Sequence, residues 1–179
     1  MADWGALLLD PTAGDSPVVD TVLAPRRPLD GARVALLDNG KANAGLILSA
    51  FASRLADRFG ARQVLTLTKA DAGTVLDPAA VADIAARSDV VLTAVGDCGS
   101  CSAATLADAV LLDRAGVPAV GICSEAFRMS ADAMAEAYGF PGFDYIRMPH
   151  PIASLDRAAV EARVDEALPR VLEILGADG

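Results

Sequence analysis

The chain has 179 residues, of which 53% are hydrophobic and 22% charged, and its formal net charge is −9. This length fits one domain with an ordinary core, and the negative charge without a basic stripe opposes binding to nucleic acid. No apolar run approaches the ~20 residues of a membrane span, and the first residues lack the pattern of a signal peptide. We therefore expect a cytoplasmic protein that binds neither nucleic acid nor membrane.

Residues 1–30 are predicted to form an extended N-terminal arm. Several prolines interrupt this segment, and proline-rich segments tend to be extended. Its apolar stretches, 7–9 and 18–23, suit packing on the core or on a neighbouring subunit. We expect a homo-oligomer, or a hetero-oligomer with a related subunit, and a single α/β domain over residues 31–179.

Strands and helices are predicted to alternate after the arm. Apolar runs indicate strands at 33–37, 63–68, 89–95, 118–122 and 144–147. Helical patterns and terminal signals indicate helices at 44–59 (stopped by Gly60), 78–87 (capped by Asp77), 102–116, 131–138 (capped by Ser130) and from Ser154 onward, with a kink or a new turn at Pro169. This alternation predicts a three-layer, flavodoxin-like α/β sandwich. Its sheet is expected to have about five parallel strands in the order 2-1-3-4-5, with helices on both faces.

Polar and reactive residues follow the predicted strands at one rim of the sheet. In open α/β sheets, ligands bind outside the carboxyl ends of the strands, where the strand order reverses. The residues at this rim are Asn39, Lys41 and Asn43 after the first strand, Asp97, Cys98, Ser100, Cys101 and Ser102 after the third, Cys123, Ser124 and Glu125 after the fourth, and His150 after the fifth. Because the first and third strands flank the reversal, Lys41 and Cys98 are expected to face one crevice.

The thiol pair of Cys98 and Cys101 is the strongest chemical signal. A helix is predicted to begin near Ser100 to Ser102, and helix N-terminal amides with a nearby lysine favour thiolate over thiol. A separation of three residues lets two sulfurs form a disulfide or resolve a mixed adduct. The alternative is a pair of buried structural cysteines, which the polar neighbours disfavour. One Cys-x-x-Cys with a single histidine argues against a tetrahedral zinc site, and no metal is predicted.

Lys41 has two interpretations. It either holds a carboxylate or phosphate near a helix start or is a solvated lysine in a turn. The segment is not a Walker loop, because Ala35 stands at the first glycine position and Ala42 follows Lys41. No Gly-x-Gly-x-x-Gly follows the first strand, so no dinucleotide is indicated. No cofactor is predicted, with flavin binding at the same crevice left open.

The remaining candidates also have a functional and a structural interpretation. His150, between two prolines, is either catalytic or structural. Glu125 is either a general acid/base or a helix cap, and Cys123 is expected to be a core residue. The predicted catalytic set is Cys98, Cys101, His150 and Glu125. The predicted substrate-binding set is Asn39, Lys41, Asn43, Asp97, Ser100 and Ser102.

The segment Val95-Gly-Asp-Cys-Gly-Ser-Cys-Ser102 resembles the motif of the UGSC family, named for selenocysteine-Gly-Ser-Cys with cysteine first in many members. The resemblance extends to Leu9-Asp-Pro-Thr12, to Leu29-Asp-Gly31 running into Asp38-Asn-Gly-Lys-Ala-Asn-Ala44, and to His150-Pro151. The motif is more weakly similar to the selenoprotein component of glycine, sarcosine and betaine reductases, where selenium attacks a carbon and leaves as a covalent adduct.

The resemblance implies that Cys98 holds the position of the reactive chalcogen and that Cys101 is its resolving neighbour. Sulfur in place of selenium is a weaker nucleophile, so local activation is needed.

Three functions compete. The first is covalent thiol chemistry on a small organic acid, in which Cys98 attacks an activated carbon or sulfur and Cys101 resolves the adduct. The second is cofactor-independent racemase, decarboxylase or lyase chemistry, in which one thiol acts as acid or base on an α-carbon. The third is a non-catalytic, redox-sensing or regulatory subunit that pairs with a larger homologue.

Overall fold

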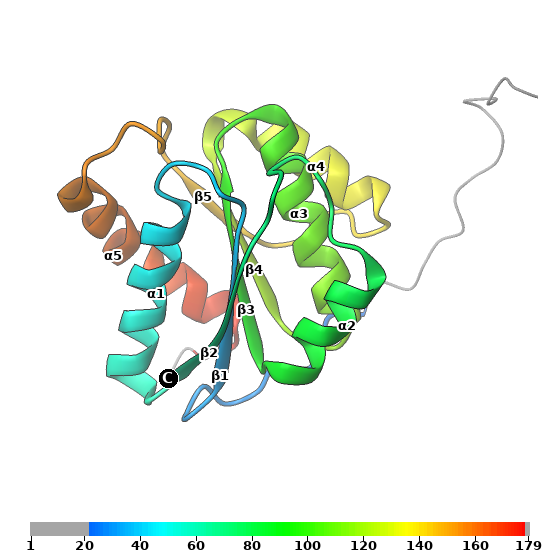
Figure 1. Cartoon of the computed structure of the whole chain (residues 1–179), viewed down its shortest axis with the longest axis vertical. Coiled ribbons are helices and arrows are strands. Elements are labelled where there is room, and N and C mark those ends of the chain that lie inside the picture. Colours follow the sequence, from blue (N-terminus) through cyan, green and yellow to red (C-terminus); the bar gives the residue numbers. More distant parts are fainter. Residues whose placement is uncertain (1–21, 178–179) are drawn as a thin grey trace, which may run out of the picture.

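The structure, a computed structural model, describes residues 22–177 (Figure 1). Most of the predicted N-terminal arm lies outside these residues, so the arm stays a prediction. Residues 22–30 contain no helix or strand, yet Leu29 is buried in the core. The Ala24 N–H donates to the buried carboxylate of Asp113 at 2.6 Å, and Arg26 pairs with the same carboxylate at 2.9 Å. These contacts attach the first described residues to Asp113, near the C-terminal end of the helix Gly99–Arg114.

The sheet has five parallel strands in the order β2-β1-β3-β4-β5, which confirms the predicted flavodoxin-like α/β fold. The strands are β1 (Arg33–Asp38), β2 (Arg62–Thr68), β3 (Val90–Gly96), β4 (Ala119–Ser124) and β5 (Ile146–Met148). β3 and β4 are buried along their whole length, as expected of apolar parallel strands covered on both faces. β2 forms one edge and is largely exposed. The order reverses between β1 and β3.

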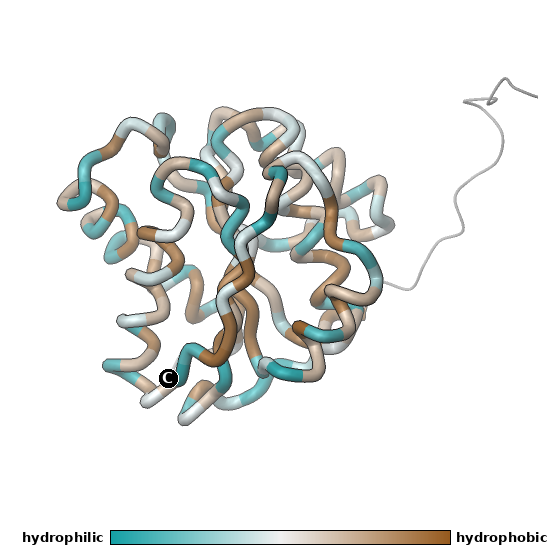
Figure 2. Tube along the Cα trace, viewed as in Figure 1, coloured by the Kyte–Doolittle hydropathy of each residue, from teal (hydrophilic) through white to brown (hydrophobic). Residues whose placement is uncertain are grey.

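Helices cover both faces of the sheet. α1 (Ala44–Phe59) and α5 (Arg157–Ile174) lie on one face, and α2 (Pro78–Arg87), α3 (Gly99–Arg114) and α4 (Arg128–Ala137) lie on the other (Figure 1). Figure 2 shows the strongly hydrophobic chain concentrated in the strands between these layers. Leu36 and Phe51 belong to the core under α1 and α5, and Leu37 and Leu106 to the core under α3. None of the described helices is both long and apolar enough to cross a membrane.

Two of the predicted helix signals are confirmed by their capping geometry. Gly60 ends α1 in the left-handed conformation (φ 62°) with its N–H bonded to the Ala56 carbonyl. The Asp77 side chain accepts the Ala80 N–H at 2.8 Å and caps α2. The predicted ranges of these two helices, 44–59 and 78–87, match α1 and α2 at both ends.

Three other helix boundaries were predicted wrongly. α3 begins at Gly99, earlier than expected, because Cys98 caps it through its sulfur. Ser130 is not a cap, because the 3-10 helix η2 (Glu125–Phe127) runs directly into α4 at Arg128. α5 begins at Arg157, after Asp156 accepts the Ala159 N–H, and it continues through Pro169 to Ile174.

Candidate functional site

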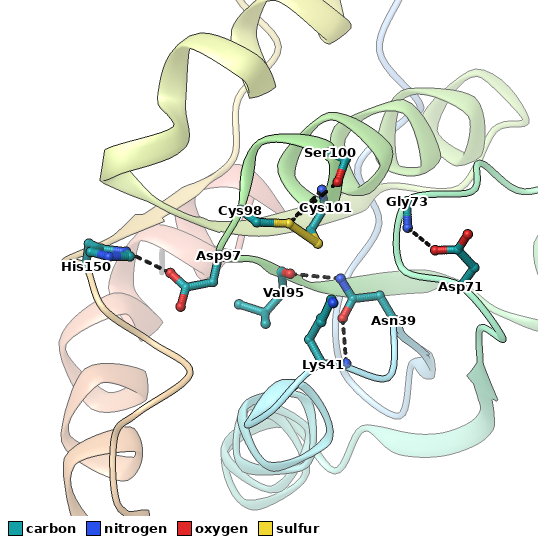
Figure 3. Close-up of a disulfide and its surroundings, with 10 residues drawn as sticks. All are labelled: Asn39, Lys41, Asp71, Gly73, Val95, Asp97, Cys98, Ser100, Cys101 and His150. Atoms are coloured by element: carbon teal, nitrogen blue, oxygen red, sulfur yellow. Dashed lines mark hydrogen bonds and ion pairs between the residues drawn. A yellow bond between two sulfur atoms is a disulfide. The ribbon is translucent and has the colours of Figure 1, made fainter.

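The candidate site is centred on two cysteines at the carboxyl end of β3. Their sulfurs form the disulfide Cys98–Cys101, drawn in Figure 3. Cys98 is partly exposed, whereas Cys101 is buried, with 3% of its surface accessible. Cys98 is therefore the more accessible residue of the pair.

Cys98 is also the N-terminal cap of α3. Its backbone is extended, and its sulfur accepts a hydrogen bond from the Cys101 N–H at 3.2 Å. The Ser100 hydroxyl lies 3.7 Å from the same sulfur. The positive end of the helix dipole and these two donors favour negative charge on that sulfur once the disulfide is reduced. We therefore expect the start of α3 to stabilise a Cys98 thiolate through these contacts.

Gly96 lets α3 pack directly onto the ends of β3 and β4. A β-carbon at this position would lie 2.5 Å from the Cys123 Sγ, 2.6 Å from the Ser102 Oγ and 2.7 Å from the Ser102 Cα. The Ser102 side chain is fully buried at this contact, so its hydroxyl faces the interior. Burial raises the pKa of Cys123 to about 12. The Cys123 thiol is therefore protonated and shielded, as expected of a core residue.

Asn39 joins the ends of β1 and β3 at the point where the strand order reverses. Its side chain is buried and donates to the Val95 carbonyl at 2.8 Å, while its oxygen accepts the Lys41 N–H at 3.2 Å. Lys41 is exposed, and Figure 3 shows its side chain extending toward the disulfide. The structure thus brings Lys41 and the thiol pair together at one rim, with Asn39 shaping the turn beneath them.

The loop after β2, which the sequence analysis did not single out, closes the other side of the site. A β-carbon on Gly73 would lie 3.7 Å from the Ser100 side chain, so this loop rests against the first turn of α3. The Gly73 N–H and the Thr74 hydroxyl hold the pKa of Asp71 below its usual value, and the charge of Lys41 adds to the effect. Asp71 thus places a carboxylate beside the rim (Figure 3). Its signal in the sequence is the Asp-x-Gly-Thr turn.

A buried ion pair fastens this loop to α3. Lys69 Nζ lies 2.6 Å from Asp108 Oδ2, and the two side chains are 7% and 0% exposed. The other oxygen of Asp108 accepts the Leu76 N–H at 2.8 Å. Both ends of the loop are therefore anchored on one carboxylate in the middle of α3.

Asp97 contacts the chain after β5 rather than the crevice between β1 and β3. Its Oδ2 accepts the N–H groups of Ile152 and Ala153 at 3.0 and 2.8 Å, and its Oδ1 lies 3.0 Å from the His150 Nδ1. Burial acts to raise the pKa of Asp97, but the hydrogen bonds from these two amides, from Ser124 and from His150 outweigh it and lower the pKa. Both carboxylate oxygens of Asp97 therefore have hydrogen-bond partners in the chain after β5.

Asn43 also uses its side chain to hold the chain after β5. Its amide nitrogen donates to the carbonyls of Ile152 and Leu155, both at 2.9 Å. Its backbone is left-handed (φ 65°) at the start of α1, a conformation that asparagine tolerates. The amide that we expected to bind substrate is thus occupied by backbone carbonyls.

Glu125 lies at the exposed start of η2. It pairs with Arg128 at 3.4 Å and with Arg147 at 3.8 Å. Its polar contacts within the described chain are therefore those of a surface carboxylate. Over residues 22–177, no three His, Cys, Asp or Glu side chains gather into a group that could hold a metal.

The fold and the site together define a doubly wound α/β protein that carries a vicinal thiol pair at the N-terminus of the helix after its central strand. The sequence model of the UGSC family matches residues 7–177, so the chain belongs to the UGSC family. No curated protein and no solved structure matches it. The weaker likeness to the reductase selenoproteins stays a prediction.

Proposed function

We propose that this protein is a thiol-dependent enzyme that reduces a small organic acid through a covalent adduct on Cys98, with Cys101 as the resolving thiol. The observation that carries the proposal is the asymmetry of the pair: the accessible Cys98 sulfur caps α3, and the buried Cys101 sulfur lies within bonding reach of it. An accessible thiol stabilised by a helix start is suited to attack, and a shielded neighbour is suited to resolution.

The proposed cycle balances with one external reductant. In the first step the Cys98 thiolate displaces a leaving group from a carbon next to a carbonyl, which forms a thioether. The Cys101 thiolate then attacks the Cys98 sulfur, and the electron pair of the sulfur–carbon bond leaves with the carbon, which takes up a proton. The substrate R–X becomes R–H and HX, and the two thiols become the disulfide. A dithiol reductant of the cytoplasm, where we place the protein, reopens that disulfide.

Lys41 is proposed to bind the carboxylate of the substrate. We expect Lys41→Ala to lower the rate at which iodoacetate alkylates the reduced protein about tenfold relative to iodoacetamide, because only iodoacetate carries the carboxylate. The thermal midpoint should not change, since an exposed lysine contributes little to stability. Arg114→Ala, the same charge change at the opposite end of α3, is the control. An unchanged ratio of the two rates would remove Lys41 from substrate binding.

Cys101→Ser is expected to trap the adduct. The test uses protein that is reduced, freed of reductant and mixed with one equivalent of 3-bromopyruvate, which carries a carboxylate and an activated carbon. Mass spectrometry should find the adduct on Cys98 in both proteins. In the wild type it should give way to the disulfide with release of pyruvate, whereas in Cys101→Ser it should persist.

The competing functions give different outcomes in the same experiment. A single thiol that acts as acid or base has no resolving partner, so the adduct would persist in the wild type as it does in Cys101→Ser and no pyruvate would be released. A redox-sensing subunit would form the disulfide with oxidants but release no pyruvate. Either result would contradict the proposed cycle.

A further inference from the structure

The sheet ends in two edge strands of different character. β5 has three residues, and the exposed Arg147 stands at its centre, so this edge is poorly suited to pair with a further strand. β2 has seven residues without a proline, and Arg62 at its start is its single charged residue. Figure 1 looks onto this edge, where β2 lies in front between α1 and α2. Within the described chain, β2 is therefore the edge that lacks the usual protection against pairing.

The second half of β2 presents unpaired backbone groups on its open side. The Lys69 N–H donates to the Asp38 carbonyl and therefore points toward β1. Because backbone groups alternate in direction along a strand, those of Thr66 and Thr68 point away from β1. No strand of residues 22–177 lies on that side of β2. The N–H and C=O groups of both threonines are thus available to a further strand.

The side chains of this half suit contact with another strand. Val64 is 38% exposed, Leu65 and Leu67 are half-buried, and Thr66 and Thr68 are exposed. Val64 is the extra residue of a bulge, so regular pairing with β1 runs from Leu65 onward. Aliphatic and β-branched side chains are those that pack best between paired strands. The uncharged stretch 64–68 therefore combines a free backbone edge with an apolar surface.

We propose that β2 is the contact between two copies of this chain, which pair their β2 strands antiparallel about a two-fold axis at Thr66. In this register Thr66 of each copy faces Thr66 of the other, and the two exchange backbone hydrogen bonds. Leu65 faces Leu67 of the second copy, and Val64 faces its Thr68. The same patch serves both copies, so the assembly closes as a dimer with one continuous sheet. This inference does not depend on the proposed function.

Charge complementarity favours a second copy as the occupant of this edge. The antiparallel register brings the exposed Arg62, at the start of one β2, to the end of the other β2, where the exposed Asp71 follows. None of the ion pairs within residues 22–177 includes Arg62 or Asp71. The two-fold axis forms this opposite-charge contact twice. Since Asp71 lies in the loop that closes the candidate site, Arg62 of the second copy would border that site.

Sedimentation of the full-length protein over a range of concentrations tests the contact. The wild type should form a dimer. Thr66→Lys sets two lysines against each other at the axis, and it should raise the dissociation constant of the dimer by roughly 10²-fold. Ala133→Lys, the same charge change on an exposed position of α4, is the control and should leave the constant within about twofold.

Amide hydrogen exchange of the wild type tests the register without any substitution. The N–H groups of Thr66 and Thr68 should exchange slowly above the dissociation constant of the dimer and rapidly below it. The Lys69 N–H is the internal control, because its bond to β1 should protect it at both concentrations.

A mixture of two charge-reversed variants tests the contact between Arg62 and Asp71. Arg62→Glu and Asp71→Lys each bring like charges together in their own dimers, which should weaken by about tenfold. The mixture should form a tighter dimer than either variant alone, because both contacts of the mixed dimer join opposite charges.

Several results would overturn this interface. A wild type that stays monomeric at every concentration excludes it, and a dimer that Thr66→Lys leaves intact must use another surface. Slow exchange of Thr66 and Thr68 in a monomer would show that residues 1–21 of the same chain cover the edge. A mixture that dimerises no better than its two components would exclude the antiparallel register at Thr66.

Discussion

Replacing Cys98 by serine is expected to abolish the adduct with 3-bromopyruvate and to lower pyruvate release by at least ~10³-fold, because a serine hydroxyl is not ionised near neutral pH. The thermal midpoint of the reduced protein should stay within roughly 4 °C of the wild type. Serine is a favourable N-terminal cap, and its hydroxyl can accept the same Cys101 N–H. Mass spectrometry and thermal unfolding of one preparation measure both quantities. Retained release in Cys98→Ser would end the thiol mechanism.

The wild-type thiols provide the matching positive result. Iodoacetamide near neutral pH should modify Cys98 first, because its sulfur is partly exposed and receives the N–H of α3. Cys101 should follow slowly from its buried position. Cys123 should stay unmodified until the protein unfolds, since its side chain is fully buried and its pKa is raised to about 12 by that burial. A Cys98 that reacts no faster than free cysteine would contradict its activation by the helix start.

Lys69→Met is expected to destabilise the protein by about 3–5 kcal/mol of unfolding free energy. The substitution leaves the Asp108 carboxylate buried in α3 without its cation, while methionine fills a similar space. Chemical denaturation with urea measures the loss. The double variant Lys69→Met/Asp108→Asn should recover most of it, because asparagine removes the charge and still accepts the Leu76 N–H. A loss below about 1 kcal/mol would show that the pair contributes little.

The same variant should have a distinctive pH dependence. Burial raises the pKa of Asp108, against the lowering effect of Lys69 and the Leu76 N–H. A carboxyl group with a folded-state pKa above its unfolded value costs stability at neutral pH, and this cost falls as the pH drops from the folded pKa to the unfolded one. Lys69→Met removes the opposing cation. Its deficit relative to the wild type should therefore be largest at neutral pH and shrink as the pH approaches ~4.

The fold was predictable because its signals are local. β3 and β4 are continuous apolar runs, and Gly60 and Asp77 mark helix ends by backbone conformation and by capping. The start of α3 was not, because a cysteine sulfur is an uncommon cap whose geometry the spacing does not reveal. Ser130 failed as a cap for a related reason: the preceding 3-10 turn already satisfies the helix entry.

Only the location of the candidate site was predictable from the sequence, not the contacts of its side chains. Strand order alone puts Lys41 and Cys98 at one rim, but it does not say where side chains point. Asp97 and Asn43 bind backbone groups more than 50 and 100 residues away in sequence, at separations of 55 and 109. The pair of Lys69 and Asp108 likewise joins residues 39 apart. Such contacts depend on tertiary packing, which no local pattern encodes.

The close contact at Gly96 restricts which residues the Gly96–Ser102 segment can carry at each position. Any side chain there would collide with the backbone of Ser102 and push α3 away from the sheet, so the position of Cys98 depends on the close packing of α3 against the ends of β3 and β4. Ser100, the second residue of α3, is exposed, so a different side chain there does not face the same collision. A substitution at Ser100 is therefore expected to change the surface beside the Cys98 sulfur without moving Cys98 and at little cost in stability.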